Sequence, residues 1–193
     1  MLTTCMGENV SPDYEPMMAE ELAFAASPDP VVDPGAAGRF SVVVVGAGII
    51  GTAIAFHLAQ RGMTDVIVCD KGGVAGQASG RSGALVRTHY TNLDEARIAL
   101  AALPWFEEWE ERVGGDCGFA PTGFLQMVDR RDQQTLRRNV EALQHIGVDT
   151  RLVGPDEIRD LQPHLHLHGD ELAAYEPRSG YADPVATTRC LAT

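Results

Sequence analysis

The sequence predicts an α/β protein organised around a parallel β-sheet, and three features near its N-terminal third support this prediction. Four consecutive valines, Val42 to Val45, suit a strand buried on both faces, as in the middle of a parallel sheet. A glycine-rich turn follows directly, and a second apolar run at residues 65–69 ends in Asp70. Strand, turn, helix and strand make a βαβ unit, whose crossover helix makes the two strands parallel. Cys69, within the second run, is therefore expected to be buried.

The turn after the first strand has the spacing G-x-G-x-x-G. Gly46 permits the tight turn, Gly48 lets a pyrophosphate approach the backbone, and Gly51 lets the next helix pack closely on the sheet. The first-turn amides of that helix and its positive dipole end suit an anion. Asp70 lies 19 residues after Gly51, where a dinucleotide-binding fold places the carboxylate that accepts the ribose hydroxyl groups. These features predict a Rossmann-like dinucleotide-binding unit. The intervening residues expected at the ligand are Ala47, Ile49 and Ile50.

The crossover helix is predicted over residues 52–61, where apolar residues recur at helical spacing. The residues expected to face the sheet are Ala53, Ile54, Leu58 and Ala59. After the second strand, residues 71–90 contain five glycines, which indicates close approaches of the backbone to a ligand or to packed segments.

Three segments together resemble a known family: VVVVGAGIIGTAIAFHLAQRG, VIVCDK and ASGRSGALVR. They are similar to the N-terminal part of the FAD-dependent amine and amino-acid oxidoreductases, which include sarcosine oxidase, glycine oxidase, D-amino-acid oxidase and dimethylglycine dehydrogenase. The resemblance implies that FAD is the cofactor and that the segment after the second strand follows its pyrophosphate and ribityl chain. The positions that it adds to the predicted cofactor site are Lys71, Ser79, Arg81, Ser82, Gly83, Ala84 and Leu85. The family usually has glutamate where this chain has Asp70, which is shorter but still accepts two hydroxyl groups.

Beyond residue 90 the sequence predicts a mixture of helices and strands. The expected helices cover residues 92–113, 132–145 and 156–161, and the expected strands lie within residues 119–128, 150–153 and 172–175. Pro104 should kink or divide the first of these helices. By resemblance, this α+β part is inserted on the substrate side, and the chain then returns toward the cofactor through a helix. The predicted organisation is a flexible acidic leader at 1–39, a first FAD-binding segment at 40–90, the start of a substrate-side domain at 91–179, and an incomplete return at 180–193. The fold is expected to be truncated at Thr193, with further strands beyond it.

The composition, 45% hydrophobic and 22% charged, is typical of a soluble globular protein. The net charge of −12 argues against binding to nucleic acid. No apolar run is long enough to cross a bilayer, and the acidic N-terminus does not look like a secretion signal, so a cytoplasmic location is expected. Four cysteines without a CxxC pair indicate free thiols and no zinc site. Alternating histidines at 164, 166 and 168 lack the further ligands that a metal site needs, so no metal is predicted.

These observations favour an FAD-dependent oxidoreductase that oxidises the C–N bond of an amino acid or N-methylated glycine, with hydride transfer to the flavin. The expected partner is a small amine or amino-acid substrate; the oligomeric state is not predicted. No catalytic residue is assigned, although Arg87 is a candidate either for a substrate carboxylate or for a structural ion pair. Two alternatives remain open: a catalytically incomplete nucleotide-binding fragment and an NAD-dependent dehydrogenase. The stretch from Ser79 to Leu85 suits a long flavin cofactor and has no evident purpose for NAD.

Overall fold

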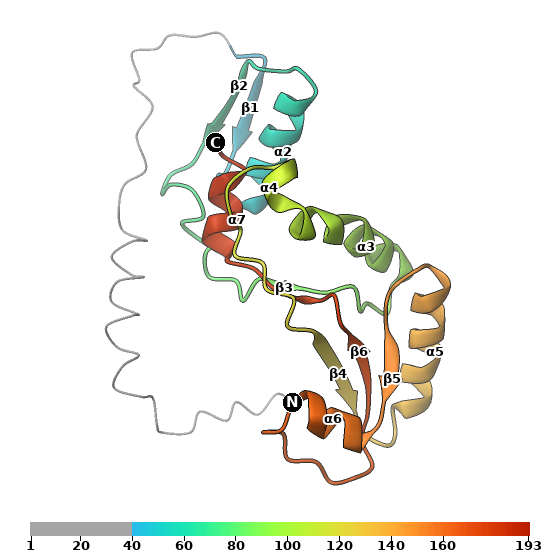
Figure 1. Cartoon of the computed structure of the whole chain (residues 1–193). Coiled ribbons are helices and arrows are strands. Elements are labelled where there is room, and N and C mark those ends of the chain that lie inside the picture. Colours follow the sequence, from blue (N-terminus) through green and yellow to red (C-terminus); the bar gives the residue numbers. More distant parts are fainter. Residues whose placement is uncertain (1–39) are drawn as a thin grey trace, which may run out of the picture.

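A computed structural model describes residues 40–193, so the predicted leader at 1–39 lies outside the described residues. The described chain runs from a small parallel sheet at one end to a three-stranded antiparallel sheet at the other (Figure 1). Its elements, in order, are β1 (Val42–Val45), α2 (Ile49–Gln60), β2 (Val66–Cys69), β3 (Leu85–Val86), α3 (Leu93–Glu107), α4 (Trp109–Arg112), β4 (Phe124–Val128), α5 (Gln133–His145), β5 (Arg151–Val153), α6 (Pro155–Leu161), β6 (Leu172–Glu176), β7 (Gly180–Tyr181) and α7 (Pro184–Cys190).

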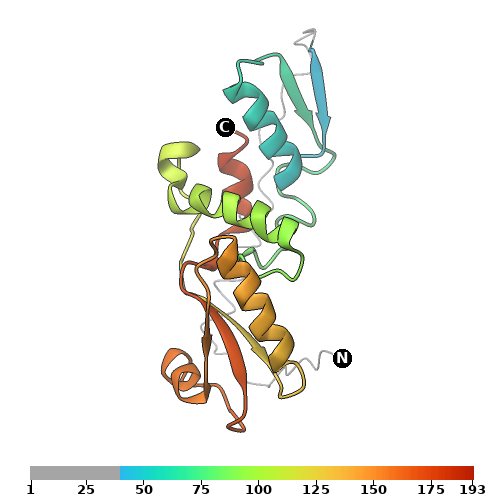
Figure 2. The ribbon, with the colours of Figure 1, turned by 90° about the vertical axis from the view of Figure 1, so that its right-hand side faces the viewer.

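The predicted βαβ unit is present: β1 pairs in parallel with β2, from Val42 opposite Val66 to Val45 opposite Cys69, and α2 is the crossover. The prediction that β1 is buried on both faces is wrong. The side chains of Val43 and Val45 are 58% and 86% exposed, because α2 covers only one face of the two strands and no described element covers the other. Cys69 lies at the same open edge of the structure and is exposed too, contrary to expectation. Figure 2 shows α2 beside the two strands.

The orientation predicted for the crossover helix is also partly wrong, since Ile54 and Ala59 are exposed. Helix α2 begins three residues earlier than expected and turns Ala53 toward the middle of the molecule. There its apolar side meets a core that is built from three distant parts of the chain. The buried members of that core are Trp109, Cys117 and Leu191. Helix α2 therefore packs against α4 and α7 as well as against strands β1 and β2.

The long helix predicted over residues 92–113 is divided into α3 and α4 at Glu108. Asn92 caps α3 through its side-chain oxygen, which accepts a hydrogen bond from the Asp94 amide at 2.9 Å. Pro104 lies inside α3 and the helix continues for another turn, since the Pro104 carbonyl still accepts from the Glu108 amide at 3.0 Å. The predicted division therefore occurs, but four residues after the proline.

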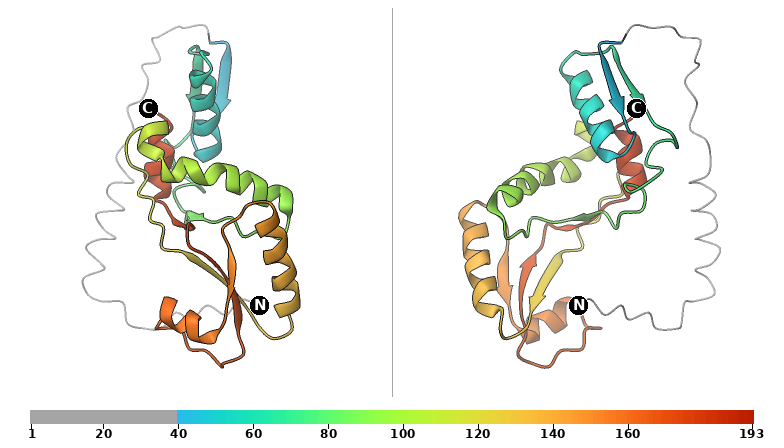
Figure 3. Two further views of the ribbon diagram at one scale, coloured as in Figure 1. Left: turned by 45° about the vertical axis from the view of Figure 1, so that its right-hand side comes forward. Right: turned by 180° about the vertical axis from the view of Figure 1, so that it is seen from behind.

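The antiparallel sheet has the order β4-β6-β5 and is covered on both faces (Figure 3). Ala174 on one face of β6 packs with Leu136 and Val140 of α5. Ala173 on the other face packs with Ile158 of α6. The alternation along β6 explains how one strand serves both layers. This is the α+β part that the sequence predicted, although β6 extends one residue further, to Glu176.

Two short strands, which the sequence analysis did not predict, connect the two ends. Leu85 in β3 lies opposite Tyr181 in β7 in an antiparallel pair. The chain then enters α7, whose cap is Asp183: its carboxylate accepts from the amides of Val185 and Ala186 at 2.8 and 2.7 Å. The predicted return through a helix is thus present, and α7 packs against α2. No helix in the described range is long and apolar enough to cross a membrane.

Candidate cofactor-binding site

The turn between β1 and α2 requires glycine at positions 46 and 51 because of the protein's own backbone conformation and packing. Gly46 has φ +109°, a conformation that other residues rarely adopt, and its amide continues the ladder by donating to the Cys69 carbonyl at 2.7 Å. A Cβ atom on Gly51 would lie 1.9 Å from the Gly46 carbonyl oxygen. The first and third glycines therefore make the tight turn and the close packing of helix on strand, as predicted.

Gly48 differs from these two glycines because the protein itself does not require glycine there. Its backbone is ordinary extended chain, with φ −81° and ψ 178°. A Cβ atom at this position would closely approach only the flexible hydroxyl group of Ser79, at 2.9 Å. The missing side chain thus leaves room for the Ser79 hydroxyl group beside Gly48. It also lets a pyrophosphate approach the backbone of Gly48 closely.

Asp70 is held rigidly against the same turn. One of its carboxylate oxygens accepts from the Ala47 amide at 2.8 Å and the other from the Gly72 amide at 2.7 Å. These two hydrogen bonds, led by that from Ala47, hold the pKa of Asp70 below its usual 3.8. The carboxylate is therefore ionised at neutral pH, and each oxygen keeps a further lone pair for a hydroxyl donor.

Ser79 connects the glycine-rich segment to the N-terminus of α2. Helix α2 has no cap from Gly48, and the Ser79 hydroxyl oxygen accepts from the Ile49 amide at 3.0 Å instead. The Ala47 carbonyl accepts from the Ala75 amide at 2.9 Å, which fixes the same segment from the other side of the turn. Two of the predicted site residues, Asp70 and Ser79, are thus brought to the glycine turn from outside it.

The remaining predicted positions are more open. Ile50 is 75% exposed at the start of α2. Lys71, Arg81, Ser82 and Gly83 are exposed. Ala84 has φ +40° and its carbonyl accepts from the Ala182 amide, while Leu85 lies in β3 and is 52% exposed. Most of these residues are exposed along the segment from the glycine turn to β3; their contacts with a flavin remain predictions.

Arg87 follows β3 and has no carboxylate partner among residues 40–193. Its guanidinium carbon lies 5.1 Å from the centre of the Tyr90 ring and 5.3 Å from that of Phe124. Within residues 40–193 the structure therefore shows no structural ion pair for Arg87. A half-buried cation that rests on ring faces keeps its hydrogen-bond donors for a ligand.

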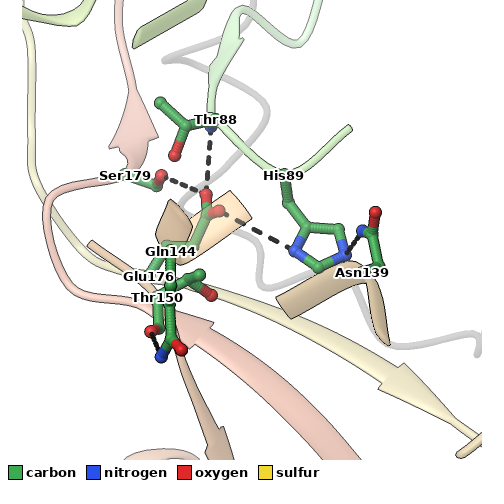
Figure 4. Close-up of polar contacts among 7 residues, drawn as sticks. All are labelled: Thr88, His89, Asn139, Gln144, Thr150, Glu176 and Ser179. Atoms are coloured by element: carbon green, nitrogen blue, oxygen red, sulfur yellow. Dashed lines mark hydrogen bonds and ion pairs between the residues drawn. The ribbon is translucent and has the colours of Figure 1, made fainter. Parts of the chain in front are cut away.

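The sequence analysis missed a buried polar group beside this arginine. Glu176, 1% exposed, accepts from the Thr88 amide at 3.0 Å and from the Ser179 hydroxyl at 2.8 Å (Figure 4). His89 is buried next to it. One signal was present in the sequence: Glu176 is a single acid at the end of the apolar run LAAYE. Acids are rarely buried without a partner, so its position directly after a predicted strand marked it for attention.

Comparison with known proteins agrees with this geometry. Residues 41–193 match the family described as FAD dependent oxidoreductase. The chain belongs to this family. It is 27% identical over 161 residues to mitochondrial dimethylglycine dehydrogenase of Rattus norvegicus, covering 80% of this chain and 18% of that protein. It is 32% identical over 151 residues to the sarcosine oxidase β subunit of an Arthrobacter species, covering 74% and 37%.

The solved structure of L-proline dehydrogenase from P. horikoshii has the same fold, with a TM-score of 0.74 and 30% identity. The match covers 80% of this chain and 41% of that one. The chain thus spans between about a fifth and two fifths of the length of these relatives. The predicted resemblance, the α/β fold and FAD as the family's cofactor are confirmed. The alternative of an NAD-dependent dehydrogenase is disfavoured by the same family match.

Replacing Asp70 by alanine is expected to weaken FAD binding by at least about tenfold, through the loss of charge-assisted hydrogen bonds to the ribose. Fluorescence titration with FAD, NAD and NADP measures the effect. The unmodified chain should reject NADP, because the Asp70 carboxylate would face its 2′-phosphate. A preference for NADP, or unchanged FAD affinity in the alanine variant, would contradict the assignment of Asp70 to the ribose.

Proposed function

We propose that this chain holds the ADP half of FAD and offers Arg87 to the carboxylate of an amine substrate whose C–N bond is oxidised. The absence of a side chain at Gly48, together with the Asp70 carboxylate fixed at the same turn, is the observation that carries the proposal. Neither strand pairing nor helix packing explains a glycine at this position. A dinucleotide that passes over the turn explains both the missing side chain and the fixed acid.

In this proposal each part of the turn has a separate task. The pyrophosphate would lie against Gly48 and the N-terminus of α2, where the first-turn amides and the helix dipole favour negative charge. Asp70 accepts the ribose hydroxyl groups, and the segment from Ser79 to Leu85 leads the flavin toward β3. The chemistry that FAD would supply when bound is acceptance of a hydride from the carbon next to the substrate nitrogen.

The proposed substrate class follows from Arg87 together with the relatives. Dimethylglycine, sarcosine and L-proline, which appear in the relatives' names, each combine an amine with a carboxylate. Arg87 provides a fork of N–H donors that matches a carboxylate, and in the described chain no acid occupies it. We therefore propose an amino acid or an N-methylated glycine as the substrate, bound through its carboxylate at Arg87.

A second candidate is a nucleotide-binding protein without turnover of its own. The exposed valines of β1 favour it, because a two-stranded parallel sheet with one uncovered apolar face is incomplete as a doubly wound core. The two candidates share the FAD site and differ in the reaction.

One experiment separates them. The purified chain is mixed with FAD, passed through gel filtration and examined for flavin absorbance, and then assayed with sarcosine, dimethylglycine, L-proline and glycine in the presence of an artificial electron acceptor. Bound flavin with turnover of a carboxylate-bearing amine supports the first candidate. Bound flavin without turnover supports the second, and failure to retain FAD at any concentration contradicts both.

A further inference from the structure

Glu176 is a buried carboxylate in an unusual position, at the end of β6 where the sheet meets the segment after β3. One oxygen, Oε2, accepts both hydrogen bonds that the residue makes, from the Thr88 amide and the Ser179 hydroxyl. The other oxygen, Oε1, has no hydrogen-bond partner. Burial of a carboxylate costs free energy unless it is paired, so this residue calls for an explanation beyond packing.

His89 faces the unpaired oxygen. Its Nδ1 lies 3.8 Å from Oε1 of Glu176, and its Nε2 lies 3.1 Å from the side-chain nitrogen of Asn139 in α5. With that amide nitrogen as donor, Nε2 carries no proton, and the proton of the neutral ring sits on Nδ1 and faces the carboxylate. Burial lowers the pKa of His89; Glu176 opposes the shift and Arg87 adds to it. Figure 4 shows Glu176 between its two groups of partners.

A closed series of contacts links Arg87 to Glu176 through Phe124 and through Thr88. The Arg87 guanidinium stacks on the ring of Phe124 in β4. Phe124 lies directly opposite Glu176 in the ladder between β4 and β6. The Glu176 carboxylate binds the amide of Thr88, which is the next residue after Arg87. The Glu176 carboxylate therefore connects the main chain next to Arg87 with strands β4 and β6. Strand β4 carries Phe124, whose ring contacts the Arg87 guanidinium.

We propose that Glu176 is a positioning residue that fixes Arg87 for the carboxylate of the substrate. The inference rests on the proposed function, in which Arg87 binds that carboxylate. The substrate is not touched by Glu176. Its Oε2 sets the main chain at Thr88, and the ladder partner Phe124 sets the plane of the guanidinium. A guanidinium that is already oriented loses less entropy when it binds a ligand, so its affinity is higher.

The test compares two ligands that differ only in charge, N,N-dimethylglycine and N,N-dimethylglycinamide. Both are titrated into the chain in excess FAD, and binding is measured by isothermal titration calorimetry, which also applies to variants that lack Arg87. Glu176→Ala removes the carboxylate that accepts the Thr88 hydrogen bond. Glu176→Asp keeps a carboxylate, but its side chain is one methylene shorter and no longer reaches the Thr88 amide. Glu176→Gln keeps an oxygen for both the Thr88 amide and the Ser179 hydroxyl.

We expect the alanine and aspartate variants to bind dimethylglycine about tenfold more weakly and the amide with unchanged affinity. The glutamine variant should restore the affinity for dimethylglycine to within about threefold of the original. Glu171→Ala is the matched control, because Glu171 also accepts from two main-chain amides but lies in a loop away from Arg87. It should change neither affinity. If the alanine variant does not fold, the comparison of aspartate with glutamine decides.

The outcomes distinguish this inference from the function on which it rests. If Arg87→Ala leaves the affinity for dimethylglycine unchanged, the proposed substrate site is wrong. If Arg87→Ala weakens dimethylglycine alone while Glu176→Asp binds it normally, only the positioning role is overturned. An equal loss for dimethylglycine and its amide in the Glu176 variants would show a general structural role and would also overturn it.

Discussion

Gly51→Ala is expected to destabilise the βαβ unit strongly. The added Cβ atom would lie 1.9 Å from the Gly46 carbonyl oxygen, and the next nearest contacts are the Gly46 carbonyl carbon at 3.1 Å and a methyl group of Val44 at 3.3 Å. None of these is the end of a flexible side chain, so the helix itself must move away from the turn. Overpacking of this kind costs about 3 kcal/mol or more, which corresponds to a fall in Tm of roughly 10 °C for a chain of this size.

Thermal unfolding followed by circular dichroism measures this effect. Gly154→Ala is the matched control, since a Cβ atom there would meet nothing within 4 Å and its φ of −93° suits any residue. It should change Tm by no more than about 2 °C. An unfolding temperature for Gly51→Ala equal to that of the control would show that α2 does not pack on the turn as the structure has it.

Gly48→Val is expected to abolish FAD binding while leaving the fold intact. The extended backbone at Gly48 is favourable for a β-branched residue, and the only close neighbour is the Ser79 hydroxyl, which can rotate away at the cost of its hydrogen bond from the Ile49 amide. The valine methyl groups would fill the space that the pyrophosphate needs, so affinity for FAD should fall on the order of 100-fold or more. This exceeds the loss expected for Asp70→Ala, which removes hydrogen bonds without blocking the site.

The two glycine variants thus separate stability from binding within one motif. For Gly48→Val the measurements are Tm in the absence of FAD, expected to lie close to that of the unmodified chain, and FAD affinity by fluorescence titration. A variant that still bound FAD tightly would place the pyrophosphate elsewhere. A variant that unfolded would show that glycine at this position serves the protein alone.

The local part of this architecture could be predicted because it depends on short-range chemistry. The conformation of Gly46 and the contact of Gly51 are set within six residues of each other, and the helix caps at Asn92 and Asp183 act on amides two or three residues away. Sequence spacing captures such effects. Asp70 could be placed as well, since the length of the crossover determines where the second strand ends.

Features that depend on distant partners were missed or wrongly predicted. The exposure of Val43 and Val45 depends on whether helices cover one face of the sheet or both. The run of four valines alone does not contain that information. The strands β3 and β7 contain two residues each and show no alternation, so they gave no signal. Glu176 makes sense only when Thr88 lies beside it, and these residues are 88 positions apart.

The core beneath α2 has a consequence for how the protein is made. Ala53 packs in the same cluster as Leu191, so 138 residues must be synthesised between one side of this contact and the other. At about 5–20 residues per second, the apolar side of helix α2 waits roughly seven to thirty seconds for Leu191 to be synthesised. During that time the helix and the open face of β1 are both accessible to chaperones, and also to the same segments of neighbouring nascent chains.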